Sequence, residues 1–424
     1  MSDTSVKNSS STEILSAITP NTELRAHAKT AFEKLGLPTS KSEEYRFTPI
    51  ARLLEKNFDL TSYKQPGSDL QQIKAFEIPE LDAHVVVMLN GQFSRNLSSI
   101  SNSDILIQEL DENQHAEHLA KHAEYQNDAL VAWNTAAWSG GVFIQIPEKK
   151  VVTKPILIYH INDTTSGEVK SITRNLVVVG KNSEVIIVEK FDSIGTNSNF
   201  SNLVTEIIVA ENAGLNFYNV QADHGNRYQF TQTTIAQANH SRVNCYTFTL
   251  DGKFVRNNLQ LNLDGEGCES HMYGLYLLHG DTLADNHTVV DHRKPNSFSN
   301  ELYKGILDGN SKGIFNGKIF VRPQAQKTNA FQSNRNILLS DKSTINTKPQ
   351  LEIWADDVKC SHGCTTGQLD DEALFYLRSR GIEKNTARAM MLYAFAAEVV
   401  ESIPNEKMKA FIDNLISERL HKNF

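Results

Sequence analysis

Short apolar runs rich in β-branched residues dominate the middle of the chain. They begin near Gly141 and are separated by Asn, Gly, Asp and Ser, the residue types that favour tight turns. Clear examples are the runs Val142 to Ile146, Pro155 to Ile161, Leu176 to Val179 and Val185 to Val188. This pattern predicts a succession of short strands rather than helices.

Two of these passages resemble each other. They read LVVVGKNSEVIIVEKF and EIIVAENAGLNFYNVQ, and their turn residues Asn182 and Asn212 lie thirty positions apart. Weaker repeats follow at Asn239-His240 and at Asp264-Gly265. A strand–turn–strand unit that recurs every 25–31 residues favours a β-solenoid, in which each coil covers the apolar face of its neighbour. A β-sandwich also has short strands and turns, so periodicity alone leaves both folds open.

Helical patterns precede the β region. Apolar residues from Leu24 to Leu35 recur at helical spacing, and Gly36 is expected to end that helix. A second short helix is expected from Pro49, and another helical stretch between Leu110 and Trp138. The serine-rich residues 1–20 are expected to be disordered.

Helical patterns also follow the β region. Asp370 is expected to cap a helix from Asp371 to Arg380, which Gly381 ends. Two more helices are expected, from Lys384 to Ser402 and from Asn405 to His421. The predicted organisation is a disordered terminus at 1–20, a helical or mixed region at 21–138, a β core at 139–365 and a helical region at 366–424.

Charge and composition exclude several classes of protein. Fifty acidic and 42 basic residues give a net charge of −8, which argues against a nucleic-acid-binding surface. The longest uncharged apolar run, Ala389 to Ala397, is far shorter than the ~20 residues that span a bilayer. The first residues contain no apolar leader sequence. Four cysteines in a chain of this length do not indicate a disulfide framework. A reducing cytoplasm is therefore the expected location.

The segment VKCSHGCTTG carries the most distinctive chemistry. It places Cys360, His362 and Cys364 at alternate positions, so that on a strand all three side chains would lie on one face. Thiolate and imidazole together suit zinc, iron or a sulfur-bearing intermediate. A structural zinc site normally needs four ligands, and no second pair lies nearby. The plain alternative is a group of polar residues at the end of a strand.

Other candidates favour structural roles. His115, His118 and His122 would share one face of a helix, but the HExxH pattern of zinc peptidases is missing, so a solvated polar stripe is favoured. A hydrolase would need a nucleophile elbow, which the chain lacks. We therefore expect hydrogen-bonded corners at the remaining candidates, which are His287, Asp291, His292, Ser297 and Ser299. The other two thiols, Cys245 and Cys268, are expected to pack as small apolar residues.

The C-terminal sequences TKPQLEIWADDVKCSHGCTTGQLDDEALFYLRSRGI and MMLYAFAAEVVESI resemble the SufB/SufD family of iron–sulfur cluster assembly proteins. The stretch from DNHTVVDH to SNRNILLS is also similar to that family. The segments LGLPTSKSEEYRFTPI and YAFAAE, together with the chain length, favour its SufD branch. The resemblance covers nearly everything after residue 20.

This resemblance implies a right-handed parallel β-helix core between helical N- and C-terminal domains. It implies a non-catalytic scaffold subunit that works with SufB-like and SufC-like partners and docks the SufC ATPase through residues from about Asp371 onward. The chain contains no P-loop and no GxGxxG motif, as expected if the partner hydrolyses the nucleotide.

The resemblance also implies where the chemistry lies. His362 is the expected iron ligand with Cys360 beside it, and Cys364 is a less favoured ligand. The cluster or iron would be transient, held at the interface with SufB, and the isolated chain would bind no cofactor firmly. The edge from Leu351 to Val358 could pair with a partner's sheet, or with a second copy in a homodimer. The alternatives are a SufB-type primary scaffold and a stand-alone Cys/His metalloenzyme.

Overall fold

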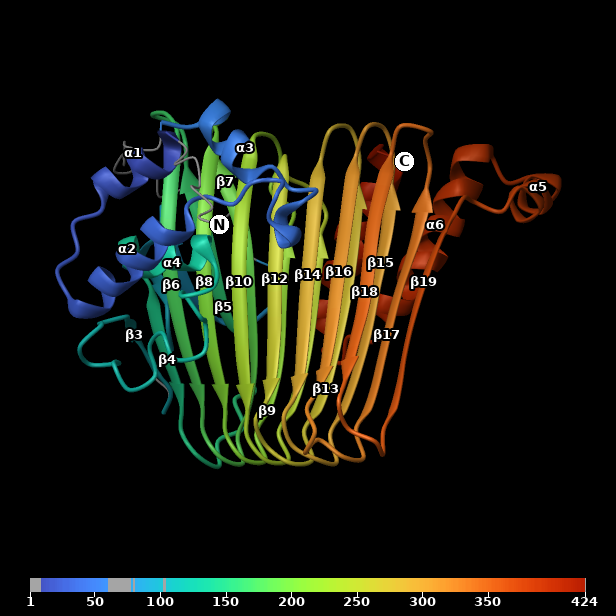
Figure 1. The fold of residues 1–424 in the computed structure, drawn as a ribbon. Coiled ribbons are helices and arrows are strands. Elements are labelled where there is room, and N and C mark those ends of the chain that lie inside the picture. The colour runs from blue at the N-terminus through green and yellow to red at the C-terminus, as the bar shows by residue number, and fades with distance from the viewer. Residues whose placement is uncertain (1–8, 60–77, 79–80, 102–103, 424) are drawn as a thin grey trace, which may run out of the picture.

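Two long parallel sheets form the body of the protein (Figure 1). The computed structural model describes residues 9–59, 78, 81–101 and 104–423. The ten-stranded sheet contains β1 (His84–Leu89), β2 (Gln92–Ser99), β5 (Ile156–Asp163), β7 (Glu184–Ile194), β9 (Gly214–Gln221), β11 (Arg242–Thr249), β13 (Glu269–Leu278), β15 (Phe298–Leu307), β17 (Asn329–Leu338) and β19 (Lys359–Gly367). The nine-stranded sheet contains β3 (Leu106–Glu109), β4 (Val142–Ile146), β6 (Val169–Val179), β8 (Asn199–Val209), β10 (Arg227–Gln237), β12 (Phe254–Leu263), β14 (Leu283–His292), β16 (Lys312–Val321) and β18 (Thr344–Ile353).

From β4 onward the chain alternates between the two sheets, so each strand from β4 to β17 pairs in parallel with the strand two elements later. Only β1–β2 and β3–β4 pair antiparallel among the described strands. This winding is a β-solenoid, which confirms the prediction from the repeats and excludes the sandwich. The sheets also begin earlier than residue 139, because β1 extends the ten-stranded sheet by pairing with β5.

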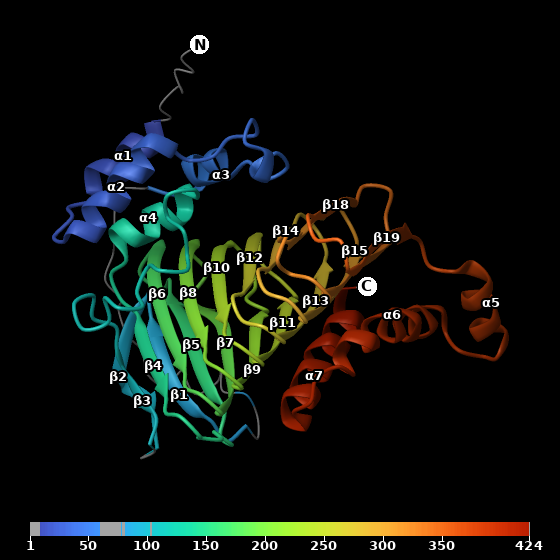
Figure 2. The same ribbon diagram turned by 60° about the horizontal axis from the view of Figure 1, so that its bottom comes forward.

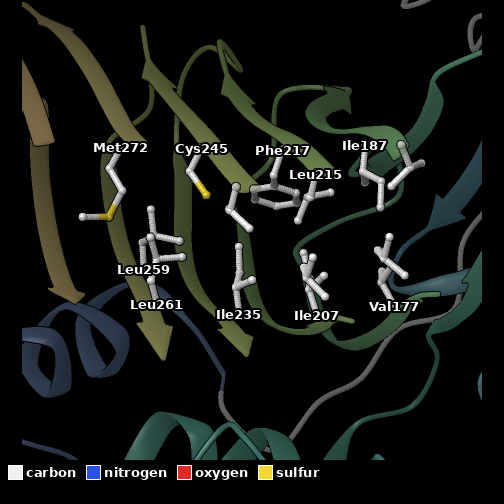
Figure 3. Close-up of a cluster of buried hydrophobic side chains, with 14 of the residues drawn as sticks. Val177, Ile187, Ile207, Leu215, Phe217, Ile235, Cys245, Leu259, Leu261 and Met272 are labelled. Carbon is white, nitrogen blue, oxygen red and sulfur yellow. The ribbon is translucent and has the colours of Figure 1, made fainter. Parts of the chain in front are cut away.

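The turns explain why the repeat is visible in the sequence. Asn182, Asn212 and His240 have φ angles of 57°, 56° and 56°, in the left-handed region that asparagine tolerates better than most residues. In-register pairing then stacks side chains of one kind along the solenoid, and apolar rows from the two sheets face each other inside (Figure 3). The rows contain Ile187, Phe217, Cys245 and Met272 from one sheet and Val177, Ile207, Ile235 and Leu261 from the other.

Helices from the N-terminal part cover the outer face of the nine-stranded sheet (Figure 2). They are α1 (Ser9–Ala17), α2 (Glu23–Leu35), the 3-10 helix η1 (Glu43–Tyr45), α3 (Ile50–Asn57) and α4 (Ala129–Ala137). Phe32 and Trp133 are fully buried in this layer, and the Trp133 ring stacks on Phe200 of β8. The predicted helix after Asn21 is confirmed, with Gly36 at its end.

Helix α1 corrects the prediction that residues 1–20 are disordered, although residues 1–8 lie outside the described residues. Ile14 is fully buried in the N-terminal cluster, and Ser11 accepts a hydrogen bond from the Leu37 backbone N–H at 2.9 Å. The prediction was based on the serine-rich composition, which does not reveal these two contacts. Apolar burial and a buried hydrogen bond order the segment.

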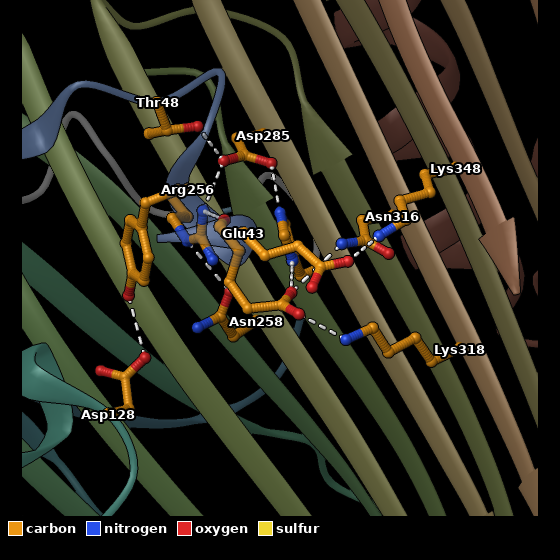
Figure 4. Close-up of polar contacts among 12 residues, drawn as sticks. Glu43, Thr48, Asp128, Arg256, Asn258, Asp285, Asn316, Lys318 and Lys348 are labelled. Atoms are coloured by element: carbon orange, nitrogen blue, oxygen red, sulfur yellow. Dashed lines mark hydrogen bonds and ion pairs between the residues drawn. The ribbon is translucent and has the colours of Figure 1, made fainter. Parts of the chain in front are cut away.

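The segment around η1 is fixed to the outer face of the nine-stranded sheet by polar contacts (Figure 4). Arg256 of β12 donates to the Glu44 backbone carbonyl at 2.8 Å and pairs with Asp285 of β14 at 2.6 Å. Glu43 pairs with Lys348 of β18. The segment therefore reaches from the middle of the solenoid to its last coil.

The C-terminal helices are α5 (Asp371–Ser379), α6 (Lys384–Val400) and α7 (Glu406–Asn423). Helices α6 and α7 pack on the outer face of the ten-stranded sheet, opposite the N-terminal helices (Figure 2). Helix α5 extends beyond β19, and none of its residues is buried. The three predicted helices are confirmed, including the Asp370 cap. Among the helices that the structure describes, none is long and apolar enough to cross a lipid bilayer.

Candidate functional site

Strand β19 is the last strand of the ten-stranded sheet and carries the Cys-His-Cys segment. In its parallel pairing with β17, Cys360 lies beside Ala330, His362 beside Gln332 and Cys364 beside Asn334. Ala330, Gln332 and Asn334 are buried inside the solenoid. Side chains paired in register lie on the same face of a sheet, so the three residues of β19 face the interior. Within the described part of the chain, no further coil covers them.

The three side chains have different surroundings. Cys360 is half-buried beside Ile319 and Ala330, and burial raises the pKa of its thiol. His362 is exposed and makes no side-chain hydrogen bond to the residues that the structure describes. Cys364 is exposed, with its Sγ 2.9 Å from the Thr347 Oγ1 of β18.

This geometry gives an incomplete set of metal ligands. Residues two apart on a strand are separated by about 7 Å, so neighbouring donors on this face need further donors to surround one ion. Among the described residues, no three His, Cys, Asp or Glu side chains cluster as a metal site. The raised thiol pKa keeps Cys360 protonated at neutral pH, whereas a neutral imidazole binds iron without losing a proton. His362 is therefore the exposed donor of the segment that makes no side-chain hydrogen bond to the described residues.

The last strand of the other sheet, β18, also has an edge that none of the described strands covers. The predicted edge from Leu351 to Val358 is correct only at its start, because β18 ends at Ile353 and a loop follows. Ile353 and Trp354 are 40% and 48% exposed. Two strand edges and an apolar corner therefore surround the exposed end of the solenoid.

The three histidines at 115–122 do not form a site. The helix predicted between Leu110 and Trp138 is limited to α4, and 112–127 consist mainly of turns. The buried carboxylate of Glu206 organises these turns by accepting the backbone N–H groups of Ala120, His122 and Ala123. His115 is buried and stacks on Phe143 with ring centroids 3.9 Å apart. The prediction that His115, His118 and His122 share one face of a helix is therefore wrong.

The residues near β14 make structural contacts. The His292 Nε2 lies 2.9 Å from the Ser299 Oγ, and burial lowers the pKa of His292 to about 4. Asp291 accepts hydrogen bonds from Arg293 and Arg322 instead of from the imidazole. The structure therefore brings together no Ser-His-Asp triad here.

The remaining candidates in this group are also held in place. His287 lies between Asp285 and Glu44, and Ser297 accepts the Cys268 backbone N–H at 3.2 Å. Cys245 and Cys268 are each 1% exposed within the apolar core, as expected, and burial raises the pKa of both thiols.

Sequence reasoning missed the interior residues behind His362. Gln332 and Glu301 occupy the same row in the two preceding coils. They lie 30 and 61 positions before His362, so the repeat length itself is the signal that could have identified them.

Comparison with known proteins identifies the family. The family model for the SufBD core domain of the SUF system for iron–sulfur cluster assembly matches residues 160–395, and the model for the SufBD N-terminal region matches residues 8–158. An iron–sulfur cluster assembly SufBD family protein of Synechocystis is 33% identical over 90% of this chain and 87% of its own length. The iron–sulfur cluster assembly protein SufD of Escherichia coli is 30% identical over 91% of this chain and 90% of its own length. SufD of Bacillus subtilis is 27% identical over 69% of this chain and 67% of its own length. The chain therefore belongs to the SufBD family of iron–sulfur cluster assembly proteins.

Proposed function

We propose that this protein is a SufD-like, non-catalytic subunit of a scaffold that it forms with SufB-like and SufC-like partners. The observation that carries this proposal is the position of His362. Its imidazole is exposed on the terminal strand of a sheet and faces the solenoid interior, where a partner's end strand can cover it. In this arrangement His362, with Cys360 beside it, supplies ligands to a nascent cluster that the partner completes.

The free strand edges supply a physical route to this assembly. Unpaired backbone N–H and C=O groups along β18 and β19 can pair with the end strands of a SufB-like solenoid. Such pairing would bury the interior face of β19 and exclude water from the ligands. A second copy of this chain could use the same edges when the partner is missing.

The C-terminal helices offer a separate surface. Phe375 and Tyr376 of α5 are 72% and 57% exposed, and Met390 of α6 is 49% exposed. Large apolar groups exposed on a projecting helix are typical of binding surfaces. We assign the docking of the SufC-like ATPase to this region, with nucleotide hydrolysis on the partner.

The remaining parts of the proposal follow from the family. We infer a right-handed solenoid, a cytoplasmic location and a transient iron–sulfur cluster that is the product of the complex rather than a resident cofactor. Cys364 stays a less favoured ligand, since its thiol contacts Thr347.

Omission of partners tests this function. The chain is purified without oxygen alone, with the SufB-like partner, and with both partners, and iron and acid-labile sulfide are measured per complex. We expect both elements in the complete complex and neither in the isolated chain. Hydrolytic turnover by the isolated chain, or a stable metal bound to it alone, would contradict a scaffold and favour a metalloenzyme.

A further inference from the structure

Side chains that pair in register on the interior face of the ten-stranded sheet form a row along the solenoid, and the last three residues of this row are polar. The row begins with the buried His84 of β1 and continues with Ile156, Ile187, Phe217, Cys245 and Met272, which are all buried and apolar. The next two members are Glu301 of β15 and Gln332 of β17, and the last is His362 of β19. Four of the apolar members are labelled in Figure 3. After His84, polar side chains therefore return to this row only in the last three coils, at Glu301, Gln332 and His362.

Glu301 and Gln332 form a buried pair. Gln332 is 3% exposed and Glu301 is 1% exposed, and the Gln332 Nε2 donates to the Glu301 Oε2 at 2.7 Å. Burial without a cation in contact raises the pKa of Glu301 to about 7. Such a pair is unfavourable in an apolar row unless its remaining polar atoms find partners.

The nine-stranded sheet leaves space for the side-chain amide of Gln332. Gly317 of β16 faces Gln332, and a Cβ atom at Gly317 would lie only 2.2 Å from the Gln332 Nε2. The backbone of Gly317 does not have a positive φ angle, so the missing side chain provides space rather than conformational freedom. Glycine at this position therefore leaves room for the Gln332 side chain.

One buried oxygen of Gln332 has no hydrogen-bond partner within the described part of the chain. Because the amide nitrogen of Gln332 faces Glu301, its Oε1 is a buried acceptor, and it has no hydrogen-bond partner among the described residues. His362 is the neighbour of Gln332 in the next coil, on the same face, and its ring has no hydrogen bond there. Adjacent strands are about 4.8 Å apart, so an amide oxygen and an imidazole in register can reach each other.

We propose that Gln332 is a positioning residue for His362: its Oε1 accepts the N–H of the imidazole and leaves the other ring nitrogen free for iron, while Glu301 and the space at Gly317 fix the amide. This inference rests on the proposed function, because it assigns His362 as the ligand. Histidines that bind metals commonly donate their second ring nitrogen to a carboxylate or carbonyl oxygen, which fixes the tautomer and the ring orientation. Gln332 supplies that oxygen without adding charge to the interior.

The first experiment observes the hydrogen bond without any cluster. The chain is labelled with ¹⁵N-histidine, and the His362 signals are identified by their loss in His362→Ala. We expect one dominant tautomer of His362 in the unaltered chain and a mixture in Gln332→Leu, which removes the acceptor at similar size. Gln332→Met is a second, more flexible variant in case Gln332→Leu does not fold. An unchanged tautomer in a folded variant overturns the proposal.

The second experiment separates this inference from the proposed function. Iron binding is measured in the complex with its partners, with ferrous iron as the probe, for Gln332→Leu and for His362→Ala. We expect Gln332→Leu to weaken iron binding by about 10–100-fold while the mass of the complex stays constant. If His362→Ala lowers iron binding and Gln332→Leu does not, the positioning role is wrong and the ligand role stands. If His362→Ala has no effect, the proposed function itself is wrong.

Discussion

The Nδ2 of Asn212 lies 2.8 Å from the Oδ1 of Asn182 and donates a hydrogen bond to it across adjacent coils. Both residues have left-handed backbone angles, so these two turns place their side-chain amides directly beside each other. The thirty-residue spacing of the two residues is one complete coil. This contact explains why a repeat of turn asparagines is visible in an otherwise degenerate sequence.

Replacement of Asn212 by alanine should destabilise the chain. Alanine at a φ of 56° is strained by about 1–2 kcal/mol, and the hydrogen bond to Asn182 is lost as well. We expect the free energy of unfolding, measured by urea denaturation, to fall by about that amount. Asn212→Gly loses the same hydrogen bond but keeps the backbone angle without strain, so its loss of stability should be smaller by about 1–2 kcal/mol. Equal losses in both variants would contradict this origin of the turn.

Glu301 should make stability depend on pH. Its pKa is raised by burial from 4.5 to about 7, so between these values the folded chain holds a proton that the unfolded chain has lost. The stability from this group is therefore complete at low pH and is lost as the pH rises to about 7. Glu301→Gln removes this titration. The free energy of unfolding of the unaltered chain, relative to that of Glu301→Gln, should decrease by about 2–3 kcal/mol between pH 5 and pH 8. A constant difference, measured by urea denaturation at each pH, would show that Glu301 stays ionised.

Proline in β19 should separate folding from partner binding. Neighbouring residues of a strand direct their N–H groups to opposite sides, so either Thr365 or Thr366 directs its N–H group toward the free edge. Proline there removes a donor that only a partner strand would use. Of Thr365→Pro and Thr366→Pro, the variant that keeps the melting temperature should lose its complex with the SufB-like partner, as measured by light scattering. Normal assembly of that variant would rule out pairing through β19.

A charge on α5 should weaken binding of the SufC-like partner without affecting the fold. Phe375 is 72% exposed, and α5 has no buried residue, so Phe375→Glu should leave the melting temperature unchanged. If Phe375 inserts into the partner, its replacement should weaken binding by about tenfold or more, measured by calorimetry. Ser379→Glu adds the same charge to an exposed position of the same helix and is the matched control. Equal affinities of the two variants would place the docking surface elsewhere.

The sequence predicted the elements that local chemistry defines. Gly36 and Asp370 mark helix ends through turn and capping preferences, and the asparagine turns mark the coils. Alternate spacing also placed Cys360, His362 and Cys364 on one face once they were taken as a strand. These features depend on residues close together in the chain.

Features that depend on distant contacts could not be predicted in this way. Glu206, far along the chain, holds the turns of 112–127 and prevents the helix that the spacing of His115 and His118 indicated. Helix α1 forms because Ile14 finds an apolar surface that composition does not reveal. The row from Glu301 to His362 needs the register of three coils, which a degenerate repeat defines only to within several residues.

The most direct test of the proposed function is the iron and acid-labile sulfide content of the complete complex with His362→Ala. Ser361→Ala is the matched control, since Ser361 is its exposed neighbour on the opposite face of the same strand. Both variants should assemble with their partners at normal mass. We predict that His362→Ala loses most of the iron and sulfide and that Ser361→Ala keeps the normal content. Normal iron and sulfide in His362→Ala would contradict the role of this residue as a cluster ligand.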